Sequence, residues 1–141
     1  MNLCDLLKDS KHICVVGISD KPGRDSGRIA LMLKNEGYHV TGVHPTLREF
    51  AGIKVYPSLH DVPGDIDIVD VFMNSKRIPE IIDDVLAVKP KVLWLQLGIR
   101  NEEAVAPVQE AGIITIQDLC IAIEYRYCNS AQKQVTSFDR I

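Results

Sequence analysis

The chain has 141 residues, 46% of them hydrophobic and 25% charged, which is enough apolar material for the core of one globular domain. Its formal net charge of −3 and pI near 5.8 speak against a nucleic-acid partner, and no run of like charge indicates a membrane surface. The first residues lack the layout of a signal peptide, and no apolar run reaches membrane-spanning length. We therefore expect a cytoplasmic protein with no nucleic-acid and no membrane partner.

The cysteines lie far apart in the sequence and form no C-x-x-C pair. Neither a zinc site nor a disulfide framework is indicated, and cytoplasmic thiols are normally reduced. We expect Cys14 to be inert inside an apolar strand and Cys120, after a strand end, to be the more reactive thiol. All four thiols are expected to be free: Cys4, Cys14, Cys120 and Cys128.

Strand and helix patterns alternate along the chain. Ser26 is expected to cap a helix that ends at Gly37, where glycine can adopt the left-handed conformation. Asn101 suits the N-cap of a later helix, which Pro107 is expected to kink. The remaining predicted elements are a helix over 2–9, strands over 13–17, 38–43, 55–56, 66–73, 91–97 and 113–117, an irregular connection over 46–54, a turn of helix over 58–63, a helix over 78–88 and a short segment over 121–127.

The strands over 66–73 and 91–97 are nearly continuous apolar runs, which is typical of parallel strands covered by helices on both faces. We predict an α/β fold, a Rossmann-like doubly wound and mainly parallel sheet of five to six strands with helices on both faces. One domain is expected over residues 1–128, followed by a polar tail over 129–141. Ligands of such sheets bind at the carboxyl ends of the strands.

The first strand leads through a polar loop into the first long helix, an arrangement that favours an anion. Gly17 allows the backbone to turn sharply, and the free N–H groups at the helix start can face a phosphate. Ser19 and Ser26 can donate hydroxyl hydrogen bonds. Lys21 and Arg24 can pair with phosphate charge, so we predict a phosphate-binding loop.

This loop departs from the usual dinucleotide fingerprint. Ser19 and Pro22 stand where G-x-G-x-x-G has its second and third glycines. The acidic residue that holds the NAD ribose is also missing, because the second strand ends in His44 and Pro45 and no carboxylate follows until Glu49. These residues favour a nucleotide whose ribose carries phosphate, although His44 alone could equally be an exposed turn histidine.

Side chains in a catalytic arrangement are scarce. There is no nucleophile elbow and no H-E-x-x-H motif, and the histidines lack metal-ligand spacing. Asp67 and Asp70 are three residues apart on a strand, so they face opposite sides and are expected to flank the sheet or cap loops. Cys120 and Glu124 could serve a reaction, but packing roles explain them better. We predict no catalytic and no metal-binding residues.

Taken together, several short motifs resemble the small stand-alone CoA-binding proteins, which are similar to the CoA-binding domain of the succinyl-CoA synthetase alpha subunit. The resemblance covers residues 10–126 and implies a Rossmann-like domain that holds the CoA diphosphate at its first loop. The second, ligase domain has no counterpart here, so ligase activity is not implied. The motifs lie at residues 16–19, 21–22, 24–26, 37–40, 43–45, 55–56, 69–72, 94–98 and 123–125.

The resemblance also implies which residues contact CoA. The family commonly has asparagine in place of His44, and basic residues in place of Leu119 and Ala122, so this chain departs from it there. The implied contacts are Gly17, Ile18, Ser19, Lys21, Arg24 and Ser26 for phosphate, Val43, His44 and Pro45 for adenosine with Lys54 near the ribose, and Phe72, Met73, Asn74, Ser75, Gln96 and Gly98 for the rest of the groove.

The resemblance and the loop chemistry together predict a protein that binds coenzyme A or acyl-CoA, as a carrier, a sensor or a regulatory module. Two alternatives stay open, an NAD(P)-binding redox protein and an interaction module with a vestigial nucleotide pocket. No protein partner is indicated by the sequence.

Overall fold

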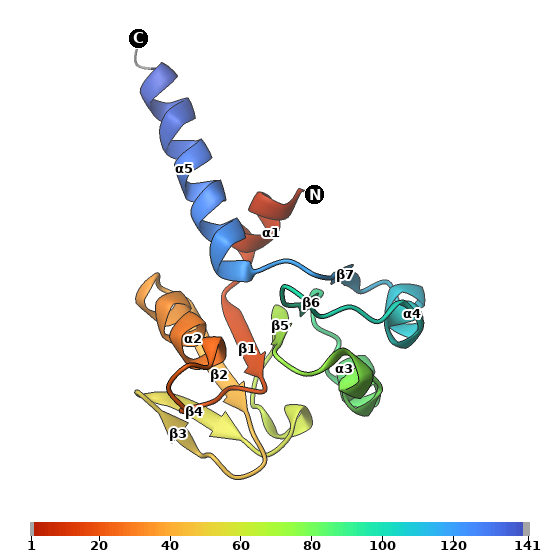
Figure 1. Ribbon diagram of the computed structural model, residues 1–141. Coiled ribbons are helices and arrows are strands. Elements are labelled where there is room, and N and C mark those ends of the chain that lie inside the picture. The colour runs from red at the N-terminus through yellow and green to blue at the C-terminus, as the bar shows by residue number, and fades with distance from the viewer. Residues whose placement is uncertain (1, 140–141) are drawn as a thin grey trace.

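A twisted, mainly parallel sheet forms the centre of the computed structural model, which describes the backbone of residues 2–139 and the side chains of residues 2–130 (Figure 1). The predicted α/β class is confirmed, but within these residues the sheet has seven strands, in the order β3-β4-β2-β1-β5-β6-β7. Among the strands that the structure describes, only β3 runs antiparallel to its neighbour. The strands are β1 His12–Val16, β2 His39–Val43, β3 Glu49–Phe50, β4 Ile53–Tyr56, β5 Ile68–Val71, β6 Val92–Leu95 and β7 Ile114–Ile116.

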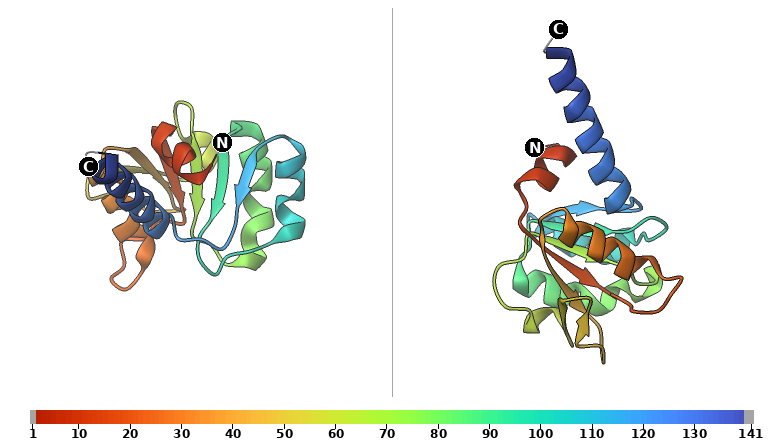
Figure 2. Two further views of the ribbon diagram at one scale, coloured as in Figure 1. Left: turned by 90° about the horizontal axis from the view of Figure 1, so that it is seen from above. Right: turned by 90° about the vertical axis from the view of Figure 1, so that its left-hand side faces the viewer.

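Helices cover both faces of the sheet (Figures 1 and 2). The apolar side chains of α1, α2 and α5 pack on one face, and those of α3, α4 and two 3-10 helices pack on the other. Among the described residues no helix is both long and apolar enough to cross a membrane. The helices are α1 Leu3–Asp9, α2 Asp25–Asn35, η1 Leu59–Asp61, η2 Ser75–Ile81, α3 Ile82–Val88, α4 Glu102–Glu110 and α5 Ile121–Asp139.

Strand β1 lies at the middle of the sheet, and all of its residues are buried. Ile13 and Val15 pack under α1, α2 and α5, whereas Cys14 and Val16 pack under α3 and α4. This alternation is the period-two pattern of a strand that is covered on both faces. The carboxyl end of β1 is thereby held rigidly between those of β2 and β5.

The start of α2 differs from the prediction. Arg24 occupies the N-cap position and makes no side-chain cap, while Ser26 lies inside the first turn and is buried. The helix ends as predicted, because Gly37 has a φ of 106° and its N–H bonds the Lys34 carbonyl. Asn101 caps α4 as expected by accepting from the Ala104 N–H, and α4 continues through Pro107.

The segment expected as one helix over 78–88 forms two helices. Its first part is the 3-10 helix η2, which begins earlier, at Ser75, and α3 follows only from Ile82. Asn74 fixes this start by accepting a hydrogen bond from the Lys76 N–H at 2.9 Å. Pro79 lies inside η2 and has no N–H, so it cannot complete the regular α-helical ladder there.

Residues expected as an irregular connection contain a β-hairpin instead. Phe50 pairs with Ile53 across a two-residue turn in which Ala51 has a φ of 50°. The Glu49 side chain accepts from the Gly52 N–H at 2.7 Å and supports this turn. The hairpin adds β3 to the edge of the sheet, which is one reason why the strand count exceeds the prediction.

The two aspartates near β5 have different roles. Asp67 caps a loop as expected, because one of its oxygens accepts from the N–H groups of Lys11 and His12. Asp70 was expected at the flank of the sheet, and that expectation is wrong. Its side chain is fully buried, and neither oxygen has a hydrogen-bond partner in the described structure. Burial raises the pKa of Asp70 well above its usual range, which favours the neutral form of this carboxyl.

The expectation of four free thiols is also wrong, because a disulfide joins Cys4 of α1 to Cys128 of α5. The two cysteines are separated by 124 residues in sequence, and only the packing of α1 beside α5 brings them together. Cys14 and Cys120 are free. Helix α5 runs on to Asp139, well past the short segment expected over 121–127, and it projects away from the sheet (Figure 2).

Candidate functional site

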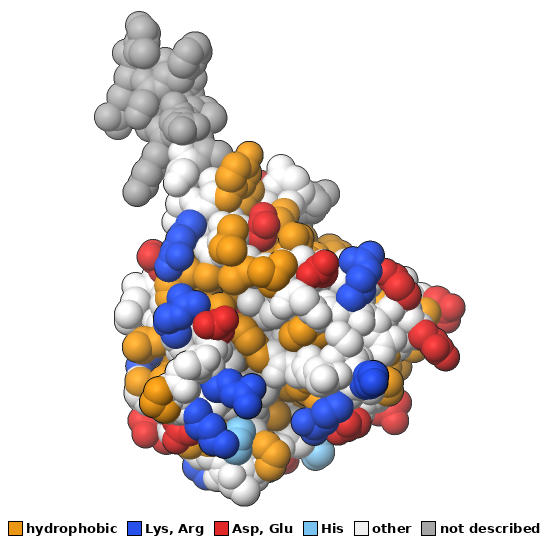
Figure 3. All heavy atoms as spheres, viewed as in Figure 1, with side chains coloured by type: hydrophobic (Ala, Val, Ile, Leu, Met, Phe, Trp, Pro, Cys, Tyr) orange, Lys and Arg blue, Asp and Glu red, His pale blue; other side chains and the backbone are white. Residues whose placement is uncertain are grey.

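A cavity of about 880 Å³ opens at the carboxyl ends of β1, β2, β4 and β5. This volume lies within the range of small-molecule and cofactor pockets. Lysine and arginine side chains gather on the lower part of the face shown in Figure 3. The lining residues are 16–19, 21 and 23–26 of the first loop, 43–45 after β2, 57–59 after β4, 72–74 after β5, and Arg77, Glu80, Ile81 and Asp84.

Two glycines allow the first loop to fold tightly against its neighbours. Gly17 has a φ of 86°, and a Cβ at this position would lie 2.3 Å from the Phe72 carbonyl oxygen. Gly27 lies in the first turn of α2, where a Cβ would come within 2.5 Å of the Ser19 carbonyl oxygen. Only glycine therefore lets the loop approach both β5 and α2. Gly27 was not among the contacts expected from the sequence, although it directly follows Ser26.

The N-terminus of α2 faces this pocket, and its N-cap residue makes no side-chain cap within the described part of the chain. Asn2 and Asn101 cap α1 and α4 with their side chains, whereas Arg24 provides no such hydrogen bond to α2. The first N–H groups of a helix have no intrahelical acceptor and carry partial positive charge. Residues 24–26 line the cavity, so these donors are available to an anion bound there.

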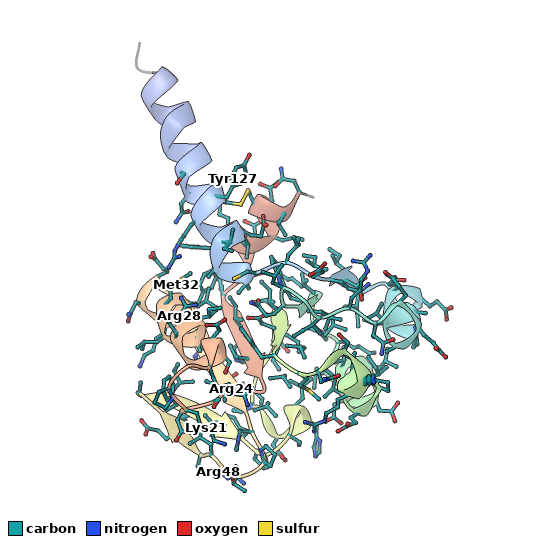
Figure 4. All side chains as sticks on the ribbon, in the orientation of Figure 1. Lys21, Arg24, Arg28, Met32, Arg48 and Tyr127 are labelled. Carbon is teal, nitrogen blue, oxygen red and sulfur yellow. A yellow bond between two sulfur atoms is a disulfide. The ribbon has the colours of Figure 1, made fainter. Side chains whose placement is uncertain are left out.

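Lys21 and Arg24 sit on a tight turn next to these donors (Figure 4). The Ser19 hydroxyl oxygen accepts from the Lys21 N–H at 3.1 Å, and the Arg24 N–H donates to the Lys21 carbonyl at 3.2 Å. Both side chains are exposed, and within the described residues neither forms an ion pair. Arg28, one turn further along α2, instead pairs with Asp25 at 3.2 Å. Lys21 and Arg24 are therefore the free cations of the loop.

The end of β2 is shaped by a histidine. Nδ1 of His44 accepts hydrogen bonds from the N–H groups of Thr46 at 3.1 Å and Leu47 at 2.9 Å. Because Nδ1 accepts twice, the ring proton sits on Nε2, which can donate to a ligand. The Arg48 guanidinium holds the same turn through three backbone carbonyls, including that of Pro45 at 2.9 Å. His44 is thus both a turn residue and a pocket residue.

The opposite wall comes from η2 and α3 and was missed from the sequence. Arg77 and Glu80 form a two-point ion pair at 3.1 and 3.2 Å. The Arg77 guanidinium lowers the pKa of the Glu80 carboxyl below its usual range, so Glu80 stays ionised. Asp84 lies beside this pair and 3.5 Å from the His60 ring. The spacing of residues 77, 80, 81 and 84 is that of one helix face, but this spacing does not by itself indicate that the face lines a pocket.

Most of the residues expected to bind CoA line one cavity. The expected contacts that do so are Gly17, Ile18, Ser19, Lys21, Arg24, Ser26, Val43, His44, Pro45, Phe72, Met73 and Asn74.

Four expected residues lie outside this cavity. Lys54 is exposed and pairs in register with Thr41, away from the carboxyl end of β4. The Ser75 hydroxyl accepts from the Arg100 N–H at 3.1 Å. Gln96 is buried and its Oε1 accepts from the Ile121 N–H at 3.1 Å, while the Gly98 N–H donates to Asp118 at 2.6 Å. The last three residues join loops to one another.

The sequence of this chain matches a known protein family over most of its length. A profile of the CoA binding domain family matches residues 11–126. The chain belongs to this family. YneT, an uncharacterized protein of Bacillus subtilis, is 39% identical over 121 residues, which make up 86% of this chain and 90% of YneT. The predicted family is thereby confirmed.

A solved structure shares the fold of this CoA-binding domain, and part of a curated ligase matches its sequence. The structure of cell-free ID.343 from Thermus thermophilus is 33% identical, covers 91% of this chain and 99% of its own, and superposes with a TM-score of 0.87. ADP-forming acetate–CoA ligase I of Archaeoglobus fulgidus is 28% identical over 74 residues, which are 52% of this chain and 11% of the ligase. About half of the chain thus matches a small part of that ligase.

Proposed function

We propose that the cavity at the carboxyl ends of the strands binds CoA or acyl-CoA, and that residues 1–128 form the binding domain of a carrier, a sensor or a regulatory module. Membership of the CoA-binding family supports the ligand, and the cavity offers a site of suitable size. The diphosphate would bind at the first loop, and the adenosine and pantetheine parts would extend to either side.

The uncapped start of α2, with Lys21 and Arg24 beside it, is the observation that carries this proposal. A diphosphate brings negative charge and many acceptor oxygens to this place, which offers free N–H groups and two unpaired cations. Charge-assisted hydrogen bonds of this kind contribute about 1.5 to 3 kcal/mol each.

The end of β2 favours CoA over NAD. A dinucleotide ribose with free hydroxyls is normally held by a carboxylate at this strand end, where this chain has His44 and Pro45. The Nε2–H of His44 can donate to the 3′-phosphate that CoA carries on its ribose. Lys54 is not proposed to contact the ribose, because it lies outside the cavity.

Calorimetric titration of CoA, dephospho-CoA and NAD in one buffer tests the proposal. We expect CoA to bind tightest, dephospho-CoA to be intermediate and NAD to be weakest, with about ten- to a hundredfold lost for one charge contact. Higher salt should narrow the gap between CoA and dephospho-CoA if the 3′-phosphate lies near solvent. NAD binding as tight as CoA would overturn both the ligand and the role of His44.

A further inference from the structure

A second cavity of about 500 Å³ lies between α1, α5 and the loop that follows α2. It shares no lining residue with the proposed CoA pocket. Both sulfur-bearing residues of the disulfide, Cys4 and Cys128, line it, and the S–S bond is visible between α1 and α5 beside Tyr127 in Figure 4. A small molecule that enters this cavity therefore meets a disulfide.

The two cysteine residues differ in exposure. Cys4 is half-buried, whereas Cys128 is buried, with 6% of its surface exposed. A thiolate attacks the sulfur that it can reach, and the other sulfur leaves. Attack here would fall on Sγ of Cys4, and Cys128 would be the leaving thiolate.

The charges that line this cavity favour a negatively charged small molecule. It includes Lys8 and Lys11, and within the described residues neither side chain forms an ion pair. Glu36 is the acidic residue of the lining, and its carboxylate accepts a hydrogen bond from the Tyr125 hydroxyl at 3.3 Å. His39 adds an imidazole ring whose centroid lies 4.3 Å from that of His12, with the two rings tilted relative to each other. Exposed cations at a cavity mouth raise the local concentration of anions.

We propose that this cavity is a thiol-exchange site at which small anionic thiols react with the Cys4–Cys128 disulfide. A thiolate RS⁻ forms a new S–S bond to Cys4 as the old S–S bond breaks, and the electron pair of that bond leaves on Cys128 as a thiolate, which takes a proton from water. A second RS⁻ then attacks the mixed disulfide, releases RSSR and leaves both cysteines reduced. The two electrons that reduce the disulfide come from the two thiolates that become RSSR.

This inference does not rest on the proposed function. Glutathione and CoA share the required chemistry, a thiol on an anionic molecule, so both are used as separate arms of the experiment. If glutathione reacts and CoA does not, the cavity admits only the smaller anionic thiol, and the proposal holds for that class.

The protein is purified without reductant, and its thiols are counted under denaturing conditions. Two free thiols are expected before full reduction and four after it. The disulfide is then treated with glutathione, CoA, 2-mercaptoethanol or cationic cysteamine at equal thiolate concentration. Samples quenched with acid are analysed by peptide mass spectrometry. We expect glutathione to react roughly three- to tenfold faster than cysteamine, and its adduct to be on Cys4.

Charge reversal at the cavity provides the decisive comparison. The Lys8→Glu/Lys11→Glu variant should react faster with cysteamine than with glutathione, which reverses the order of the two rates. The Lys76→Glu/Lys89→Glu variant carries the same charge change outside the cavity, so it should still react faster with glutathione. A Cys128→Ser variant treated with glutathione disulfide should form a mixed disulfide on Cys4, which peptide mapping distinguishes from any adduct on the free thiol of Cys120. Equal rates for anionic and cationic thiols, or an order unchanged by the cavity variant, would overturn the proposal. So would four free thiols that persist after treatment with glutathione disulfide.

Discussion

Nδ1 of His44 accepts a hydrogen bond from the Leu47 N–H at 2.9 Å and a second one from Thr46. An asparagine side chain closes the same kind of turn through its Oδ1. An asparagine in place of His44 could therefore accept the same backbone hydrogen bonds. The difference between the two residues lies at Nε2, which has no counterpart in asparagine.

We predict that His44→Asn keeps the stability of the protein and His44→Ala does not. Alanine removes the acceptor from two backbone N–H groups, which should cost about 1 kcal/mol, whereas asparagine replaces that acceptor. Urea unfolding of the two variants measures the difference. Equal destabilisation by both substitutions would contradict the role of the ring nitrogen in the turn.

Replacing Lys21 and Arg24 together by alanine should weaken CoA binding by at least tenfold and leave the unfolding free energy within about 0.5 kcal/mol. Both side chains are exposed on a loop and make no ion pair in the described structure, so folding does not depend on them. Arg28→Ala is the matched control, because Arg28 lies nearby but outside the cavity and pairs with Asp25. Calorimetry that finds equal CoA affinity in both variants would remove Lys21 and Arg24 from the site.

Gly17→Ala should be much more destabilising than Gly23→Ala. Both glycines have a φ of 86°, so both alanine variants pay the cost of about 1 kcal/mol for a left-handed backbone. At Gly17 the new Cβ would also lie 2.3 Å from the Phe72 carbonyl oxygen, whereas nothing lies within 4 Å of a Cβ at Gly23. Thermal unfolding compares them, and similar melting temperatures would show that the loop can relax away from β5.

Asp67 and Asp70 should affect the pH dependence of stability with opposite signs. Burial raises the pKa of Asp70, so the folded protein keeps a proton that the unfolded chain loses above about pH 4, and stability falls as pH rises. The pKa of Asp67 is lowered in spite of some burial, because its carboxylate accepts from backbone N–H groups and faces Lys91. Its contribution is present at neutral pH and is lost as pH falls.

Asp70→Asn should therefore remove the loss of stability on raising the pH, and Asp67→Asn should remove the loss on lowering it. Urea unfolding between pH 3 and pH 8 measures both slopes against the unchanged protein. If Asp70→Asn left the pH dependence of stability unchanged, the pKa of Asp70 would not be raised by folding.

Among the free thiols, Cys120 should be alkylated well before Cys14. Burial raises the pKa of Cys14 to about 12, so this thiol is neither ionised nor accessible, whereas Cys120 is half-buried at the start of α5. Iodoacetamide labelling of the folded protein followed by peptide mapping gives the order. Early labelling of Cys14 would mean that β1 opens more readily than its burial indicates.

The parts of the fold that local patterns specify could be predicted. The apolar run of β1, the glycine that ends it and the buried face of α2 at Ile29, Ala30 and Leu33 are all readable from neighbours in sequence. The hairpin at β3 was not predicted, because its turn uses Ala51 where asparagine or aspartate usually signals such a turn. The start of α2 was misplaced because Ser26 has the side chain of a cap but lies in the first turn.

The parts of the candidate site that carry a local sequence motif at a strand end were predicted. The part formed by a segment that is distant in sequence was missed. The first loop and the end of β2 carry their own signals. The wall formed by Arg77 and Glu80 could be assigned only after η2 was seen to lie across the strand ends. Gln96 and Gly98 were expected at a ligand because they follow a strand, but their polar atoms bind Ile121 and Asp118.

The bond between Cys4 and Cys128 closes the intervening chain into a covalent ring, and every loop of the proposed CoA pocket lies inside that ring. A protease that cuts the exposed turn at Lys21 or the turn at Ala51 would leave both fragments in one molecule of nearly unchanged mass. Separation of the fragments would require a reductant as well as a denaturant. New N- and C-termini could likewise be introduced in these loops, because the disulfide would still join the two parts of the chain.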